Sequence, residues 1–125
     1  MLDNFGGTNT NTRARADGVG AGLKNTTIII ANQGPVDGAP FAATVCNEYT
    51  VAVGGVTYGD WYLPSQYEIN LLYLQKNVVG GFSNNVYWTS SELNDSVAWY
   101  ENFENGGLNF DFKNVTNRLR AIGAF

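Results

Sequence analysis

The chain has 125 residues, of which 44% are hydrophobic and only 14% are charged, and its formal net charge is −4. This length predicts a single domain with its own core, and the acidic balance argues against nucleic-acid binding, which needs a basic face to displace counterions. Histidine is absent, which removes the commonest general base and transition-metal ligand, so we expect no enzymatic activity and no cofactor. No apolar run approaches the roughly 18 residues needed for membrane insertion.

The beginning of the chain is rich in Gly, Asn and Thr, so residues 1–12 are predicted to be a linker or an oligomer-contacting arm. The domain itself is expected to occupy residues 13–125. The single cysteine, Cys46, has apolar neighbours, which favours a buried and inert thiol. No export signal is recognisable at the start, so export would depend on a longer parent protein.

Three segments in the first part of the chain are predicted to be helices. In residues 25–34 the run of three Ile favours a strand, but the flanking Asn and Gly-Pro are helix punctuation, and we prefer a short helix. Apolar residues of 40–49 fall on one helical face. The strongest local signal is the capping box of Ser65 and Glu68, which predicts a helix over 66–76.

From Tyr87 onward the apolar pattern changes to a period of two, which predicts a meander of strands. Asn105-Gly106 favours a two-residue type I′ turn, which would pair 103 with 108, 101 with 110 and 99 with 112. A last strand over 117–122 is expected to close the sheet. The predicted core face carries Trp99, Phe103, Leu108, Phe110 and Phe112, interrupted by Glu101, with Trp88 also expected in the core. The predicted polar face carries Tyr100, Asn102, Asn109 and Asp111.

A series of motifs from about residue 20 to the end resembles the Lcl C-terminal domain family, named for the C-terminal domain of the Legionella collagen-like adhesin. The motifs are Trp61-Tyr-Leu-Pro-Ser65, Glu68-Ile-Asn-Leu-Leu-Tyr73, Gly80-Gly-Phe82, Tyr87-Trp-Thr-Ser-Ser-Glu92, Ala98-Trp-Tyr-Glu-Asn-Phe103 and Arg118-Leu-Arg-Ala-Ile-Gly-Ala-Phe125. The resemblance implies an α+β protein with a variant of the C-type-lectin-like fold, in which short helices pack on a twisted antiparallel sheet. The sequence departs from the family in having Gly123 where a second basic residue often stands.

The resemblance also implies a function. Family members are typically exported surface modules without enzymatic activity, and the named adhesin is a trimer that binds sulfated glycosaminoglycans and promotes biofilm formation. We therefore expect an extracellular, homotrimeric binding module that recognises a polysaccharide, a glycosaminoglycan or a host surface receptor. Two alternatives remain: a variable recognition protein of a diversity-generating retroelement, and a structural trimerisation cap of a surface fibre.

The candidate binding residues fall into two groups. Arg118 and Arg120 alternate along the last strand, so both guanidinium groups leave on one side, where they could hold sulfate or carboxylate groups. The alternative is internal pairing with acidic residues such as Asp60, Glu68 or Glu92. The second group is the predicted polar face, which combines Tyr and Asn as antibody paratopes do; its members are Tyr100, Asn102, Asn109, Asp111 and, beyond them, Lys113. An ordinary solvated sheet face is the alternative for this group.

Acidic residues cluster in the same region, and oxygen-rich loops of this kind can take calcium. Their spacing matches no EF-hand loop, so no metal site is assigned.

Overall fold

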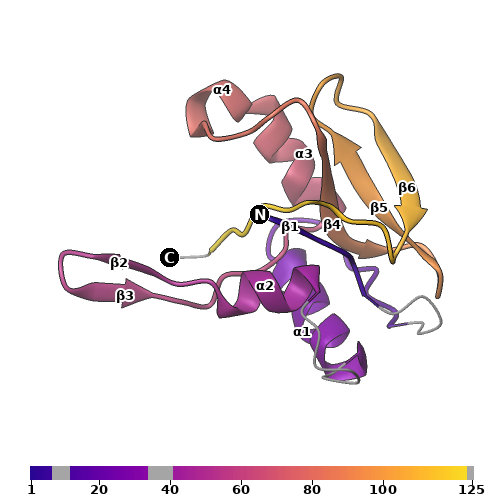
Figure 1. The fold of residues 1–125 in the computed structure, drawn as a ribbon, viewed down its shortest axis with the longest axis horizontal. Helices are drawn as coiled ribbons and strands as arrows, with labels where there is room; N and C mark the ends of the chain where they lie inside the picture. Colours follow the sequence, from indigo (N-terminus) through magenta and orange to yellow (C-terminus); the bar gives the residue numbers. More distant parts are fainter. Residues whose placement is uncertain (7–11, 34–40, 124–125) are drawn as a thin grey trace.

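The computed structural model describes residues 1–6, 12–33 and 41–123, which form a mixed α+β fold with short helices and a curled sheet (Figure 1). Five strands form the main sheet in the order β1-β7-β4-β5-β6, and two more form a separate hairpin. Within these residues no helix has the length and apolar character required to cross a membrane. The α+β prediction is confirmed at this level of description.

The helices and strands follow one another as expected for most of the chain. The helices are α1 (Ala21–Gln33), α2 (Ala42–Glu48), α3 (Gln66–Leu74) and α4 (Lys76–Val79). The strands are β1 (Leu2–Asp3), β2 (Val51–Val53), β3 (Val56–Tyr58), β4 (Val86–Glu92), β5 (Val97–Asn102), β6 (Leu108–Phe112) and β7 (Asn117–Arg118). All three predicted helices are confirmed, although the first begins earlier and the third is followed by α4. The expected last strand is shorter, because beyond β7 only Ile122 makes a bridge, to Tyr62.

The capping box at the start of α3 is confirmed, and its Glu68 also binds the start of a second helix. The Ser65 hydroxyl accepts a hydrogen bond from the Glu68 amide, and Glu68 Oε1 accepts one from the Ser65 amide at 3.1 Å. The same carboxylate accepts the Gly22 amide at 2.7 Å and the Gly20 amide at 3.1 Å. Because those amides lie at the start of α1, Glu68 fastens the N-terminal ends of two helices to each other.

Replacing Gly22 with alanine tests this close approach. An added Cβ would lie 2.6 Å from the Leu63 carbonyl oxygen and 2.6 Å from Glu68 Oε1. Because the first of these is backbone and cannot rotate away, we expect destabilisation by about 1–3 kcal/mol, measured by thermal unfolding. Gly59→Ala is the matched control, since nothing lies within 4 Å of its added Cβ. Equal melting temperatures for the two variants would contradict the proposed contact.

The β5–β6 hairpin pairs in a different register from the predicted one. Trp99 pairs with Phe110 and Glu101 with Leu108, so the ladder is shifted by two residues and the turn at Asn105-Gly106 is a longer loop. The two-residue turn is therefore wrong. The physical reason is Phe103, whose ring is buried against α3, so it leaves the strand instead of extending the ladder. A shift of two residues preserves which side chains share a face.

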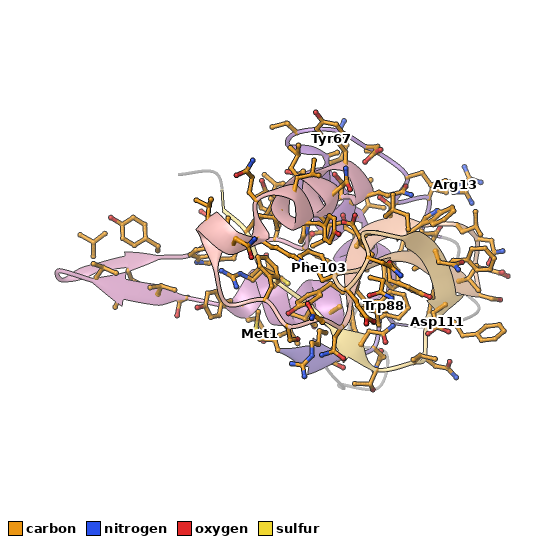
Figure 2. All side chains as sticks on the ribbon, turned by 90° about the horizontal axis from the view of Figure 1, so that it is seen from above. Met1, Arg13, Tyr67, Trp88, Phe103 and Asp111 are labelled. Atoms are coloured by element: carbon orange, nitrogen blue, oxygen red, sulfur yellow. The ribbon has the colours of Figure 1, made fainter. Side chains whose placement is uncertain are left out.

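Both faces of the sheet are covered. Neighbouring residues of β4 point to opposite faces, and each face packs against a different core cluster. Trp88 belongs to the larger core cluster with residues of α1 and α2, while Tyr87 and Phe103 form a second cluster with Ile69 of α3. Figure 2 labels Trp88 and Phe103 within the body of the molecule.

The burial of the β5–β6 faces differs from the prediction. On the predicted core face Leu108, Phe110 and Phe112 are 41%, 49% and 61% exposed. Tyr100, predicted to face solvent, packs against the larger core cluster. The exposure of the three β6 side chains follows from their position in the sheet. Because β6 is an edge strand, its side chains on either face extend beyond the covering helices.

The first residues of the chain, which we expected to be a linker, contribute to the fold. β1 pairs with β7 through Leu2 and Arg118, and the Phe5 ring is buried 5.6 Å from the Trp88 ring. The Trp88 indole nitrogen also donates to the Asp3 carbonyl at 3.1 Å. The described part of the predicted linker is thus an integral part of the domain; residues 7–11 lie outside the described residues.

A hairpin that the sequence analysis did not anticipate extends away from the body of the molecule (Figures 1 and 2). β2 and β3 pair Val51 with Tyr58 and Val53 with Val56, and both central glycines, Gly54-Gly55, have positive φ. Two glycines between short β-branched runs are a recognised hairpin signal, so this element was detectable from the sequence.

Candidate ligand-binding pocket

An open pocket of about 530 Å³ lies beside β7, at the base of the β2–β3 hairpin. Its walls carry aromatic rings and two cations: Tyr49, Trp61, Phe82, Tyr87, Arg118 and Arg120. No acidic residue is among the described residues that line it. The pocket therefore combines apolar ring surfaces with positive charge.

Arg118, at the end of β7, and Arg120, just beyond it, line the same pocket, as their alternation predicted. Arg118 pairs with Leu2 on one edge and with Tyr87 of β4 on the other, and directly paired residues share a face of the sheet. Arg120 follows two residues later and lines the same pocket. Leu119, between them, is buried in the larger core cluster, which fixes the strand's orientation.

Neither arginine is neutralised by an acidic side chain within the described residues. The Arg120 guanidinium lies 4.7 Å from the centroid of the Phe82 ring and donates to the Gly80 carbonyl at 3.3 Å. The suggested acidic partners are otherwise engaged, because Glu68 accepts backbone amides and Glu92 binds a lysine. The internal-pairing alternative is therefore wrong for those two acids, and no salt bridge joins Asp60 to either arginine.

Two pairs of rings stand at the walls of the pocket. On the hairpin side Tyr49 and Trp61 contact edge to face at 5.2 Å, and the Trp61 indole nitrogen donates to the Tyr58 carbonyl at 3.0 Å. Toward α4, Phe82 and Tyr87 contact at 5.4 Å. These rings come from separate parts of the chain, and the sequence analysis did not identify them as site residues.

Lys113 was predicted to belong to a binding surface, and this is wrong. Its side chain is fully buried and its Nζ lies 2.7 Å from Glu92 Oε2. Glu92 also accepts hydrogen bonds from the amide and hydroxyl of Thr12 and from the Arg13 amide. Burial alone would raise the pKa of Glu92, but the hydrogen bond from Lys113, together with those from Thr12 and Arg13, outweighs burial and lowers the pKa. Lys113 is therefore a structural counterion of Glu92. It follows directly after the end of β6, where its side chain is buried in the interior.

The predicted polar face does not join the arginine pocket. Its residues lie on β5 and β6, at the far end of the sheet from β7, with β4 between them. Figure 2 shows Asp111 well separated from Met1, which lines the pocket. The structure therefore assembles Arg118 and Arg120 in one site and leaves Tyr100, Asn102, Asn109 and Asp111 outside it.

Two of these polar side chains accept hydrogen bonds from backbone amides of β6 itself. Asn109 Oδ1 accepts the Phe110 amide at 2.8 Å and Asp111 Oδ1 accepts the Phe112 amide at 2.9 Å. At the end of β6 the Lys113 amide donates to the Ser96 carbonyl, so the amides of odd-numbered residues point toward β5. The amides of Phe110 and Phe112 therefore point away from β5, toward the outer edge of the sheet. Asn102 likewise accepts the Glu104 amide at 2.9 Å.

Groups with the potential for other chemistry are sparse in the described residues. Cys46 is buried as predicted, and burial raises the pKa of its thiol to about 12, which keeps it protonated and unreactive. Within the described ranges, no three Cys, Asp or Glu side chains lie close enough to hold a metal ion.

No family model matches the chain, and no curated protein matches it. The resemblance to the Lcl C-terminal domain family thus rests on the sequence motifs and stays a prediction.

Proposed function

We propose that the chain is a non-catalytic binding module of a bacterial surface adhesin, and that it recognises an anionic extracellular polysaccharide, such as a sulfated glycosaminoglycan. The observation that carries the proposal is the pocket in which Arg118 and Arg120 lie among four aromatic rings and have no acidic partner in the described part of the chain. The proposal includes a C-type-lectin-like fold, an extracellular location and a homotrimer.

The chemistry of the pocket suits an acidic sugar. A guanidinium group donates paired hydrogen bonds to sulfate or carboxylate oxygens, and it retains its charge at every physiological pH. Rings such as Trp61 and Tyr49 offer apolar surface to the C–H face of a sugar, with polar atoms at their edges. A volume of about 530 Å³ is within the range of small-molecule sites, so the pocket would hold one or two sugar units of a longer chain.

Arginine substitutions test the proposed function. We expect Arg118→Ala to weaken binding of a heparin tetrasaccharide by about ten- to a hundredfold, because one charge-assisted hydrogen bond contributes about 1.5–3 kcal/mol. Binding would be measured by surface plasmon resonance over a salt series, with an unsulfated polysaccharide as the neutral probe and with and without calcium. Affinity should fall with salt because the attraction is electrostatic.

Arg15→Ala is the matched control, since Arg15 is exposed outside the pocket. Both substitutions remove one cation, so a loss confined to Arg118→Ala would place the ligand in the pocket. Equal affinities for the wild type and Arg118→Ala would contradict the assignment of the site. No binding of heparin at millimolar concentration would contradict the polyanion ligand itself.

A second candidate, a structural trimerisation cap, is favoured by a different observation. The hairpin and β6 expose several apolar side chains, namely Val53, Val56, Leu108, Phe110 and Phe112. Apolar surfaces of this kind mark contacts between subunits. Both candidates predict a trimer in sedimentation equilibrium, so heparin binding separates them: a cap forms a stable trimer at micromolar concentration but shows no saturable sugar binding.

A further inference from the structure

Glu101 is a buried carboxylate that nothing in the proposed binding mechanism uses. It lies in β5, paired with Tyr87 of β4 on one side and Leu108 of β6 on the other. It is fully buried, and within the described residues neither carboxylate oxygen has a hydrogen-bond partner. A buried charge without a partner is strongly unfavourable, so burial raises the pKa of Glu101 to about 7.

Among the residues that the structure describes, no charged group is paired with Glu101. The titratable side chains on β4, β5, β6, α3 and α4 are Tyr87, Glu92, Tyr100, Asp111, Tyr67, Glu68, Tyr73 and Lys76. Glu92 pairs with Ala98, on the opposite face of the sheet from Glu101, and binds Lys113; Tyr100, the neighbour of Glu101 in β5, also points to that opposite face. Lys76 Nζ donates to the Phe103 carbonyl at 2.8 Å, and Glu68 is bound by the backbone amides near α1. Asp111 is on the opposite face of the sheet from Glu101, since it pairs with Ala98.

The surroundings of Glu101 are also the wall of the arginine pocket. Tyr87, directly opposite Glu101, lies 4.6 Å from the Phe103 ring, and Phe82 stacks on the same ring at 4.7 Å. Tyr87 and Phe82 both line the pocket, and Arg120 lies over the Phe82 ring. A displacement of this cluster would therefore move the rings and the guanidinium group that face the ligand.

We propose that protonation of Glu101 controls ligand binding at the Arg118–Arg120 pocket, an inference that rests on the proposed function of that pocket. Neutral Glu101 is compatible with the closed packing of α3 on β4 and β5. Ionised Glu101 requires water, which enters only when the cluster of Phe103, Tyr87 and Phe82 loosens. Glu101 is thus a positioning residue: it acts on the ligand through the pocket wall.

The direction of the effect follows from the two states. In an open state with a hydrated carboxylate the pKa of Glu101 returns toward its ordinary 4.5, whereas in the closed state it is about 7. This difference favours the open state by up to about 300-fold once the pH exceeds both values. Affinity is therefore highest in acidic solution, falls as the pH rises from 4.5 to about 7, and stays low above this window.

The test is the pH dependence of heparin tetrasaccharide binding in the wild type and in Glu101→Gln. Between about pH 5.5 and about pH 8.5 the wild type should lose about tenfold in affinity, while the variant, which cannot ionise, should keep a constant affinity. Glu104→Gln is the matched control, because Glu104 is an exposed acid in the following loop and should leave the wild-type profile unchanged. The same pH profile in Glu101→Gln as in the wild type would overturn the proposal.

A measurement without ligand keeps the two proposals separate. Amide hydrogen exchange of α3, corrected for intrinsic exchange, should show lower protection at about pH 8.5 than at about pH 5.5 in the wild type but not in Glu101→Gln. If heparin binds at neither pH, the proposed function fails, while this loss of protection would still support the switch. Constant protection in the wild type would overturn the switch regardless of binding.

Discussion

Replacing Lys113 with methionine is expected to lower the free energy of unfolding by about 3–5 kcal/mol. The lysine is the counterion of Glu92, and both side chains are fully buried. Methionine keeps much of the volume but leaves the carboxylate with only the Thr12 and Arg13 donors. Urea denaturation at neutral pH measures the loss, which is a large part of the stability of a domain of this size.

Lys24→Met is the control, because Lys24 lies exposed on α1 and its replacement should change stability by less than about 0.5 kcal/mol. The effect of Lys113→Met should also depend on pH. Since the pKa of Glu92 is lowered, its pairing stabilises the fold above the ordinary carboxylate range, and this contribution is lost as the pH falls through the lowered value. A loss below 1 kcal/mol at neutral pH would mean that the pair is hydrated.

Replacing Glu101 with glutamine is expected to stabilise the protein at alkaline pH, by about 3 kcal/mol at about pH 8. Because the folded state raises the pKa of Glu101 from 4.5 to about 7, it binds more protons than the unfolded chain between these values. The stability of the wild type must therefore fall as the pH rises through this window and stay low above it. Glutamine resembles the protonated acid and removes this dependence.

Denaturant unfolding of Glu101→Gln and the wild type across the pH range would measure this difference. The two proteins should have similar stabilities below about pH 4.5, where the wild-type carboxyl group is also neutral. Glu104→Gln should follow the wild type at every pH, since Glu104 is exposed. A constant difference between Glu101→Gln and the wild type would show that the glutamine acts through packing and not through charge.

The parts of the fold that the sequence predicted are those with local causes. The helix at α3 was predicted because Ser65 and Glu68 satisfy backbone donors within one turn. The β5–β6 register was not, because the burial of Phe103 against α3 overrides the local preference of Asn105-Gly106 for a tight turn. Phe5 gave no local signal either, since a single ring among polar residues is buried only when a distant partner such as Trp88 covers it.

The candidate site, like the fold, was predictable only where its cause is local in the sequence. Strand alternation was sufficient to place Arg118 and Arg120 on one side of β7. The rings of the pocket come from four separate segments, so no pattern within a window of the sequence brings them together. Lys113 looked like a surface cation because its partner, Glu92, lies 21 residues earlier in the chain. The two-residue alternation shows which side chains share a face of a strand, but it does not show which face the helices cover.

The caps on the outer edge of β6 affect how this protein behaves at high concentration. Fibril growth needs free backbone donors to which the next chain can add, and here Asn109 and Asp111 already occupy those of Phe110 and Phe112. The two caps thus lower the tendency of this edge, with its exposed Phe110 and Phe112, to template aggregation. In the retroelement alternative, these same two positions would be randomised, and many of the resulting variants would lose the oxygen that keeps the strand edge closed. Diversity at this edge would be limited by solubility before it was limited by recognition.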